Sequence, residues 1–381
     1  MPPSKWKTCN PEGKRRVIVT KDLPGSRWLK ILTRADCRVE IDTSTEPLSL
    51  AEIQSAIGDR CDGAIGQLTE KWGEELFAAL QGAGGHVYSN YAVGFNNIDV
   101  SAATRYGIAV GNTPGVLTET TAEMAVALTF AAARRTGEAE RFLRSGKYNG
   151  WLPTLFLGKL LWRKTLGIVG MGRIGSAYAR MMAEGHRMNV LYFDLYPNPM
   201  LEEEIAAFGI FLKSHGEEPV SCRRVKHLEE LLQTADCVSI HTVLDDSTRH
   251  LFNSHRLSLM KENAILVNTS RGPVIDEAAL VDHCRRRSEF RAALDVFEEE
   301  PRLKPGLAEL ENVVIVPHIA SATGWTREGM AILAAGNVSA VLLGYPAWKS
   351  PDISPFIGDL PPRAAPSILN AGELNIPVYK Q

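Results

Sequence analysis

Near the middle of the 381-residue chain stands Leu166-Gly167-Ile168-Val169-Gly170-Met171-Gly172-Arg173-Ile174-Gly175, the stretch that decides the fold. Its apolar first half predicts a buried strand, and the G-x-G-x-x-G spacing predicts a tight turn into a helix. In this pattern the second glycine lets the backbone approach a pyrophosphate, and the third allows close packing of helix on strand. The free N–H groups at the helix start favour phosphate. The stretch therefore predicts a dinucleotide site.

The next apolar run ends in Asp194, nineteen residues after Gly175, where a carboxylate binds the hydroxyls of the adenosine ribose. No arginine follows directly, since the run continues Leu195-Tyr196-Pro197. A carboxylate repels a 2′-phosphate, so the sequence favours NAD(H) over NADP(H). The residues expected to bind the cofactor are Gly170, Gly172, Arg173, Ile174, Asp194 and Thr242.

Short apolar runs alternate with helical patterns on both sides of this motif. Before it, strands are expected at 16–20, 37–41, 63–66 and 107–110, with helices at 49–57 and 71–80. A long helical pattern runs from 118 toward 144, and the Gly- and Pro-containing stretch 146–162 is expected to form a loop or arm. After it, strands are expected at 166–170, 189–194, 237–242, 264–268, 291–297 and 313–316, with a last helix at 321–343. This alternation is typical of α/β folds with parallel sheets.

The composition sets limits on the class of protein. Hydrophobic residues make up 45% and charged residues 23%, which fits a globular protein. A net charge of −2 gives no general attraction to nucleic acid or to anionic membranes, and the apolar runs are too short to span one. The six cysteines show no disulfide or metal spacing, which favours reduced thiols inside a cell and no metal site.

Three ionisable residues lie just beyond successive late strands: Arg271, Glu300 and His318. Ligands of open α/β sheets bind outside the carboxyl ends of the strands, so these side chains are expected to converge. Reduction of a 2-keto acid needs a cation that holds the carboxylate and polarises the carbonyl, which suits Arg271. It also needs a proton donor, which suits His318, with Glu300 orienting and stabilising the imidazolium.

Each of these residues also has a purely structural interpretation. An arginine in a loop after a strand often forms only a salt bridge, and a single histidine after a strand is usually structural. Glu300 lies in the acidic run Glu298-Glu299-Glu300, which is compatible with a solvated turn. Spacing alone does not bring the three together.

At these residues the chain resembles the D-isomer-specific 2-hydroxyacid dehydrogenases. Three stretches carry the resemblance: the glycine motif, 267–277 around Arg271, and 294–319 around Glu300-Pro301 and Pro317-His318. Within that family the runs 65–70, 111–120 and 325–330 look most like the plant-type, NADH-dependent hydroxypyruvate reductases of photorespiration.

The resemblance implies two Rossmann-like or flavodoxin-like parallel-sheet domains with the active site in the interdomain cleft. The substrate domain would comprise 1–118 and 321–381, with the NAD-binding domain at 119–320. It also implies that Asp295 contacts the nicotinamide carboxamide and that the backbone at Val93 and Gly94 binds the substrate carboxylate. A homodimer is expected, in which Trp151 either reaches the partner's active site or anchors the arm in the interface.

The expected activity is NADH-dependent reduction of hydroxypyruvate to D-glycerate, and of glyoxylate to glycolate. The alternatives are another D-2-hydroxyacid dehydrogenase, of the phosphoglycerate, formate or D-lactate type, and a non-enzymatic NAD-sensing corepressor. The first residues lack the apolar core of a secretory signal. Plant relatives end in the peroxisomal signal Ser-Lys-Leu, whereas this chain ends Val378-Tyr379-Lys380-Gln381, so peroxisome, mitochondrion and cytosol all stay open.

Overall fold

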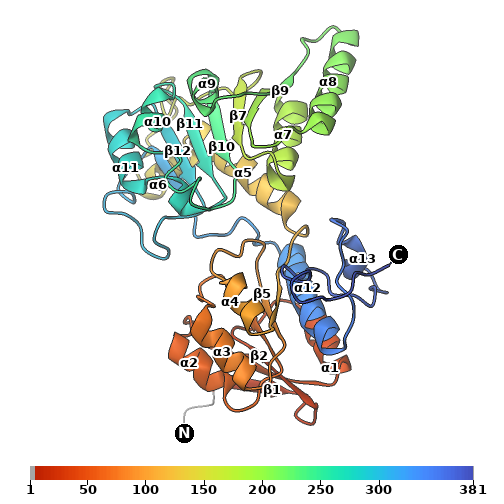
Figure 1. Cartoon of the computed structure of the whole chain (residues 1–381). Coiled ribbons are helices and arrows are strands. Elements are labelled where there is room, and N and C mark those ends of the chain that lie inside the picture. The colour runs from red at the N-terminus through yellow and green to blue at the C-terminus, as the bar shows by residue number, and fades with distance from the viewer. Residues whose placement is uncertain (1–4, 381) are drawn as a thin grey trace. The chain divides into compact units, whose positions relative to one another are not determined.

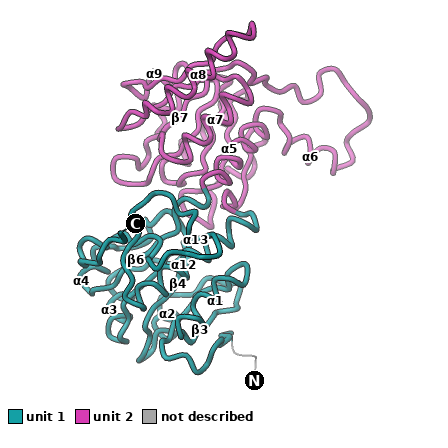
Figure 2. Tube along the Cα trace, turned by 90° about the vertical axis from the view of Figure 1, so that its right-hand side faces the viewer, with its two compact units in different colours: residues 1–117, 322–381 teal, residues 118–321 magenta. Residues whose placement is uncertain are grey.

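The computed structural model describes residues 5–380, which form two compact units. Unit 1 comprises residues up to Leu117 and from Ala322 onward, and unit 2 comprises Thr118–Ser321 (Figure 2). Unit 1 is thus built from both ends of the chain, with unit 2 inserted between them. The expectations that concern the first four residues and Gln381 lie outside the described residues.

Unit 1 contains a six-stranded sheet of order β1-β3-β2-β4-β5-β6. Its strands are β1 (Trp6–Cys9), β2 (Arg15–Val19), β3 (Cys37–Asp42), β4 (Gly63–Gly66), β5 (Val87–Asn90) and β6 (Ala109–Gly111). Only β1 pairs antiparallel, with β3; the order of the five parallel strands is the flavodoxin-like one. All four residues of β4 and of β5 are buried, as expected for strands covered on both faces.

Helices cover both faces of this sheet. They are α1 (Arg27–Arg34), α2 (Leu50–Ile57), α3 (Glu74–Gly82), α4 (Val100–Arg105), α12 (Gly324–Leu342) and α13 (Ser354–Ile357). On one face α2, α3 and α4 pack on an apolar cluster that contains Trp72, Phe77 and Tyr88. On the other face lie α1 and α12, the latter supplied by the C-terminal part of the chain (Figure 1).

Unit 2 contains a seven-stranded, fully parallel sheet of order β13-β12-β11-β10-β7-β8-β9. Its strands are β7 (Thr165–Val169), β8 (Asn189–Phe193), β9 (Cys222–Arg224), β10 (Cys237–Ile240), β11 (Ile265–Asn268), β12 (Arg291–Leu294) and β13 (Val313–Ile315). Counted from β7, this is the Rossmann order with one further strand. The order reverses between β7 and β10, which is where doubly wound sheets bind nucleotides.

Two apolar cores, one on each face, hold unit 2 together. Its helices are α5 (Thr118–Ala133), α6 (Thr136–Arg144), α7 (Arg173–His186), α8 (Pro199–Ser214), α9 (Leu228–Thr234), α10 (Ser254–Leu259) and α11 (Glu277–Arg286), with a short 3-10 turn at Gly272–Val274. Residues of α5, α7 and α8 form one core with the sheet, and residues of α9, α10 and α11 form the other. The α/β class with two parallel-sheet domains is therefore confirmed.

One expectation about elements was wrong, and three strands were missed. The helical pattern from 118 toward 144 is divided into α5 and α6, because Arg135 adopts a left-handed conformation with φ of 55°. The strands β1, β5 and β9 were not predicted from the sequence, because their polar residues interrupt any apolar run. None of the described helices combines the length and the apolar composition that a membrane span requires.

Candidate active site

The glycine motif lies at the junction of β7 and α7, as its spacing predicts. Gly172 is the N-cap of α7, and no side chain caps the free N–H groups of the first turn. A Cβ atom on Gly172 would point into open space, whereas one on Gly175 would collide with the carbonyl oxygen of Gly170. The second glycine thus leaves room for a ligand and the third permits close packing.

Asp194 follows β8 and its carboxylate lies against the glycine loop. Oδ2 accepts a 2.6 Å hydrogen bond from the Met171 amide, and Oδ1 accepts one of 3.0 Å from the Tyr196 amide. These bonds fix the carboxylate at the carboxyl edge of the sheet, beside the start of α7. The open approach at Gly172, the uncapped helix end and this acid together fit a bound dinucleotide.

The other expected cofactor residues surround the same loop. Arg173 and Ile174 open α7, with Arg173 exposed and Ile174 half-buried. Thr242 lies just after β10, and its backbone passes so close to Gly170 that a Cβ atom there would lie 2.6 Å from the Thr242 nitrogen. Structure and expectation agree on the location, while the binding roles stay predictions.

An arginine near Asp194 was missed by the sequence reasoning. Arg224, the last residue of β9, donates from Nε and Nη2 to the Asp194 carbonyl oxygen, at 3.1 and 2.8 Å, and from Nη2 to that of Leu195, at 2.8 Å. The available signal was topological, because the third strand of a Rossmann sheet lies beside the second. It was overlooked because β9 is only three residues long and largely polar.

Arg271 stands in a loop that buried polar groups hold in place. Asn268 Nδ2 donates to the Arg271 carbonyl at 2.9 Å, and Asn268 Oδ1 accepts from the Ser270 amide at 3.0 Å. The next residue, Gly272, lies so close to the Phe297 carbonyl that a Cβ atom would collide with it, so this loop and the 297–300 segment run together. Burial lowers the pKa of Arg271, an effect that the nearby charge of Glu300 opposes.

Glu300 and His318 form a hydrogen-bonded pair. Glu300 Oε2 lies 2.8 Å from His318 Nδ1, and Glu300 Oε1 accepts from the Phe297 amide at 3.0 Å. Burial raises the pKa of Glu300, but the hydrogen bond and charge of His318, the Phe297 amide and the charge of Arg271 outweigh it and leave the pKa below its usual range. With Nδ1 engaged by the carboxylate, Nε2 is the imidazole nitrogen available to a substrate.

The backbone at His318 adopts a conformation that the sequence did not predict. Its φ is 52°, in the left-handed region that few residues other than glycine occupy. The fully buried Asp295 supports it: its carbonyl accepts from the His318 amide at 2.9 Å, and its carboxylate accepts from the Ile319 and Ala320 amides at 2.6 and 2.9 Å. Burial raises the pKa of Asp295 despite these bonds. Asp295 thus positions the His318 segment, and a contact with the nicotinamide carboxamide stays a prediction.

In unit 1, Val93 and Gly94 lie in the loop that follows β5. Asn112 Nδ2 donates to the Val93 carbonyl at 2.8 Å, and Asn90 Nδ2 donates to the Gly94 carbonyl at 2.9 Å. Within residues 5–380 the amides of Val93 and Gly94 donate to no acceptor. Two fixed, half-buried amides of this kind are suited to a carboxylate.

Trp151 lies in the stretch after α6, which extends away from the rest of unit 2 (Figure 2). Its side chain is 79% exposed. Other large apolar side chains of this arm, residues 146–162, are exposed as well: Leu152, Leu157, Leu160 and Trp162. Among residues 5–380, no hydrogen bond, ring contact or ion pair joins Trp151 to another expected site residue of unit 2.

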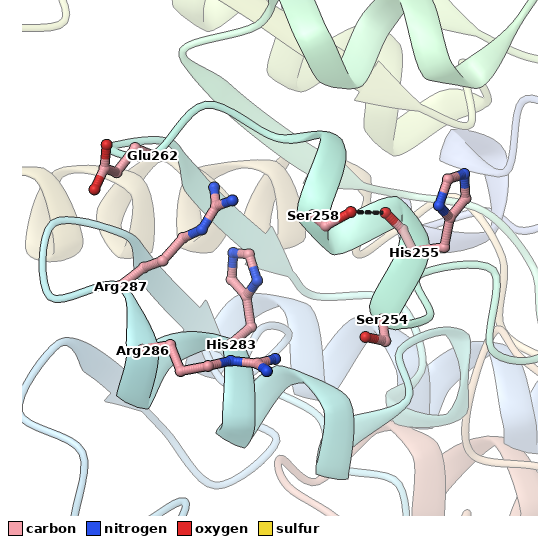
Figure 3. Close-up of a pocket in the computed structure, with 7 residues that line it drawn as sticks. All are labelled: Ser254, His255, Ser258, Glu262, His283, Arg286 and Arg287. Atoms are coloured by element: carbon pink, nitrogen blue, oxygen red, sulfur yellow. Dashed lines mark hydrogen bonds between the residues drawn. The ribbon is translucent and has the colours of Figure 1, made fainter.

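A separate pocket of unit 2 lies between α10 and α11 and contains none of the expected site residues. Its lining consists of Ser254, His255, Ser258, Glu262, His283, Arg286 and Arg287. In Figure 3 the ring of His283 lies between the Arg286 and Arg287 side chains. His283 is buried and its Nε2 has no hydrogen-bond partner among the described residues, so burial, with the charges of both arginines, lowers its pKa to about 4.

Comparison with known families agrees with this geometry. The family description "D-isomer specific 2-hydroxyacid dehydrogenase, NAD binding domain" matches residues 126–320, which is most of unit 2. The chain belongs to the D-isomer-specific 2-hydroxyacid dehydrogenases, and its unit 2 is the NAD-binding domain of that family. The expectations of an NAD-dependent enzyme and of an NAD cofactor are thereby confirmed.

Relatives narrow the resemblance. The chain is 58% identical to a glycerate dehydrogenase of Cucumis sativus, over 98% of each chain. It is 42% identical to a glyoxylate reductase of Korarchaeum cryptofilum, over 87% of this chain and 94% of the relative. Among solved structures, the TT0316 protein of Thermus thermophilus is similar with a TM-score of 0.77 and 37% identity, over 93% of this chain and 99% of that one.

Proposed function

We propose that this enzyme reduces hydroxypyruvate to D-glycerate with NADH, and glyoxylate to glycolate less efficiently. The Glu300–His318 hydrogen bond of 2.8 Å, beside the loop of Arg271 in the NAD-binding unit, carries this proposal. It supplies a fixed proton donor close to a fixed cation, which is what reduction of a 2-keto acid requires. The names of the relatives, glycerate dehydrogenase and glyoxylate reductase, support the choice of substrates.

Arg271 holds and activates the substrate in this proposal. Its planar guanidinium presents paired donors to the carboxylate and the keto oxygen of a 2-keto acid. Its partial burial strengthens that interaction, because the local dielectric constant is lower than in water. In unit 1, the free amides of Val93 and Gly94 donate to the substrate carboxylate.

His318 transfers the proton. Glu300 accepts from Nδ1 and stabilises the imidazolium, so Nε2 carries the proton that goes to the keto oxygen as that oxygen becomes a hydroxyl. When bound, NADH would supply the hydride that the carbonyl carbon receives. The balance is one 2-keto acid, one NADH and one proton converted to one 2-hydroxy acid and NAD⁺. Gly170, Gly172, Arg173, Ile174, Asp194 and Thr242 would hold the cofactor, with Asp295 contacting its carboxamide.

The test is a substrate panel followed by NADH absorbance. Hydroxypyruvate, glyoxylate, pyruvate and 3-phosphohydroxypyruvate are each supplied with NADH and then with NADPH. We expect rapid turnover of hydroxypyruvate with NADH, slower turnover of glyoxylate, and much slower turnover with NADPH. Preference for pyruvate or for the phosphorylated acid would replace the proposed substrate, and NADH binding without turnover of any acid would favour the corepressor alternative.

We further propose that the enzyme is a homodimer formed through the arm 146–162. Exposed apolar side chains concentrated on one projecting segment are costly in a monomer and typical of an interface. Two roles of Trp151 are distinguished by Trp151→Ala. If Trp151 contacts the substrate, the variant should have a higher KM for hydroxypyruvate and the particle mass of a dimer. If Trp151 anchors the interface, the variant should have a lower particle mass by light scattering.

The location that we propose is a reducing compartment inside the cell. All six cysteines carry free thiols in the structure, and Cys37, Cys61, Cys237 and Cys284 are buried. Reduced, unpaired cysteines are the usual state in the cytosol and in organelle matrices, not in secreted proteins. Imaging of a tagged full chain distinguishes these compartments.

A further inference from the structure

Arg224 places a cation beside the acid that selects the cofactor. In the parallel pairing of β8 and β9, Arg224 lies opposite Tyr192, two residues before Asp194. Its guanidinium reaches past the end of β8 and donates to the carbonyl oxygens of Asp194 and Leu195. The positive charge therefore contacts the carbonyl group of Asp194, the residue whose carboxylate is proposed to bind the ribose.

No carboxylate of the described residues neutralises this charge. Within residues 5–380, Arg224 forms no ion pair, and the two carbonyl groups it contacts carry no net charge. The neighbouring Arg223 differs, since it pairs with Glu230 at 2.9 Å. Successive residues of a strand point to opposite faces, so the two arginines serve different surroundings. A guanidinium without an anionic partner is the group with which proteins bind phosphate.

We infer that Arg224 is able to bind a 2′-phosphate on the cofactor, and that repulsion by the Asp194 carboxylate prevents this binding in the native enzyme. The inference rests on the proposed contact of Asp194 with the adenosine ribose. At that position the fixed carboxylate repels a phosphate of charge about −1.5 to −2, while the exposed Arg224 attracts it through water. Hydrogen bonds hold the Asp194 carboxylate against the glycine loop, whereas water screens the exposed Arg224, so repulsion of the phosphate prevails in the native enzyme. The preference for NADH then comes from Asp194 alone and not from the lack of a nearby cation.

Binding measurements on the whole enzyme test this without turnover. The probes are adenosine 5′-monophosphate and adenosine 2′,5′-bisphosphate, which differ only in the 2′-phosphate, with dissociation constants measured by calorimetry. The variants are Asp194→Ser, Arg224→Met, and the double variant. Arg223→Met is the matched control, being an adjacent exposed arginine on the same strand. Thermal midpoints show whether each variant is folded.

In Asp194→Ser we expect the bisphosphate to bind at least about tenfold more tightly relative to the monophosphate than in the native enzyme. Adding Arg224→Met should weaken binding of the bisphosphate about fivefold or more and leave the dissociation constant of the monophosphate within about twofold. The bisphosphate affinity that remains should depend less on salt concentration. Arg223→Met should leave the dissociation constants of both ligands unchanged.

The outcomes separate the inference from its premise. If Asp194→Ser leaves the ratio of the two ligands unchanged, the proposed ribose contact is wrong. If Asp194→Ser changes the ratio but Arg224→Met weakens both ligands equally, Arg224 only supports the loop and the inference is overturned. Combined with Asp194→Ser, Arg224→Lys keeps the positive charge without donating to both carbonyls, so this variant should retain most of the preference for the bisphosphate. If it is folded and binds the bisphosphate as weakly as the Arg224→Met variant does, the inference is also overturned.

Discussion

Hydrogen bonds fix both the guanidinium and the backbone of Arg271. Its Nη1 donates to the Ser270 carbonyl at 2.7 Å, and Asn268 fixes the Arg271 carbonyl. These bonds restrict the planar guanidinium to one orientation, which favours a two-point grip on a carboxylate or keto oxygen.

Arg271→Lys should lower kcat/KM for hydroxypyruvate by about 100-fold or more, because one ammonium group does not reproduce a two-point grip. NADH affinity should change little. Steady-state kinetics check this, with Arg256→Lys as the control, since Arg256 pairs with Glu229 elsewhere in unit 2. Near-native kcat/KM in Arg271→Lys would remove Arg271 from the mechanism.

The Glu300–His318 pair predicts opposite pH dependences in the two directions. Reduction uses the imidazolium as proton donor, so kcat/KM for hydroxypyruvate should fall as pH rises, while oxidation of D-glycerate needs the neutral ring and should gain. The low pKa of Glu300 keeps it a carboxylate at neutral pH. Glu300→Gln removes that charge, so the loss of reductive activity should begin at lower pH. Glu299→Gln, whose parent pairs with Lys304, is the control. Coincident profiles for Glu300→Gln and native enzyme would contradict the pairing role.

His283 predicts a pH-dependent stability unrelated to catalysis. Its folded pKa of about 4 lies below the ordinary value of 6.5, so the unfolded chain takes up the proton first as pH falls. The contribution of the neutral ring is complete above pH 6.5 and is lost as pH falls toward 4, on the order of 1–3 kcal/mol.

His283→Phe keeps a ring against Phe290, which the native ring meets edge-on at 4.5 Å between centroids. It should lose less thermal stability than native enzyme between pH 7 and pH 5. His255→Phe, on the exposed rim of the same pocket (Figure 3), is the control. Parallel stability curves for His283→Phe and native enzyme would show that burial of His283 is not the cause.

At the scale of elements, two glycines at the junction of β7 and α7 have different tasks: Gly172 leaves room for the cofactor, and Gly175 permits the fold. Gly172→Ala adds a Cβ atom in open space, so the fold should persist while NADH affinity falls at least about tenfold, because the methyl group occupies the pyrophosphate approach. Gly175→Ala drives a Cβ atom into the Gly170 carbonyl, so thermal stability should fall markedly.

Gly185→Ala is a matched control in the same helix, since its Cβ atom meets nothing within 4 Å. It should be neutral or stabilise α7 by about 0.5–1 kcal/mol. Fluorescence titration with NADH and thermal melts of the three variants check these expectations. Equal loss of stability in Gly172→Ala and Gly175→Ala would remove the distinction.

Elements with an apolar run or a strong periodicity were predictable, and short strands with polar residues were not. The motif at 166–175 and the strands after it follow from glycine spacing and apolar runs. The proximity of Glu300 and His318 was expected only from their shared position beyond successive strands, because spacing alone does not bring them together. The left-handed turn at Arg135 was not predictable, because nothing in an Ala-rich helical pattern marks where it stops. Arg224 was missed for a related reason: a polar three-residue strand has no periodicity, and only the order of the sheet brings it to Asp194.

At the scale of the whole molecule, unit 2 is one continuous segment with a core on each face of its sheet. Segments of this size with their own cores usually fold independently. Residues 118–321 expressed alone should therefore fold and bind NADH within about tenfold of the full chain's affinity, without reducing hydroxypyruvate. Circular dichroism and fluorescence titration check this, and an unfolded segment would contradict it.

Unit 1 has the opposite organisation, and this affects how the chain is made. The ribosome releases β1 to β6 first, then all of unit 2, and only then α12. At about 5–20 residues per second, the sheet of unit 1 waits on the order of ten to forty seconds for α12, which completes the layer that α1 begins. Asn337 of α12 bonds to Ser89 and to the Asn112 carbonyl, so those groups also lack these partners until then. The newborn chain thus presents to chaperones a sheet face that only α1 covers, and a ribosome that stalls within unit 2 leaves the α12 side of that face uncovered.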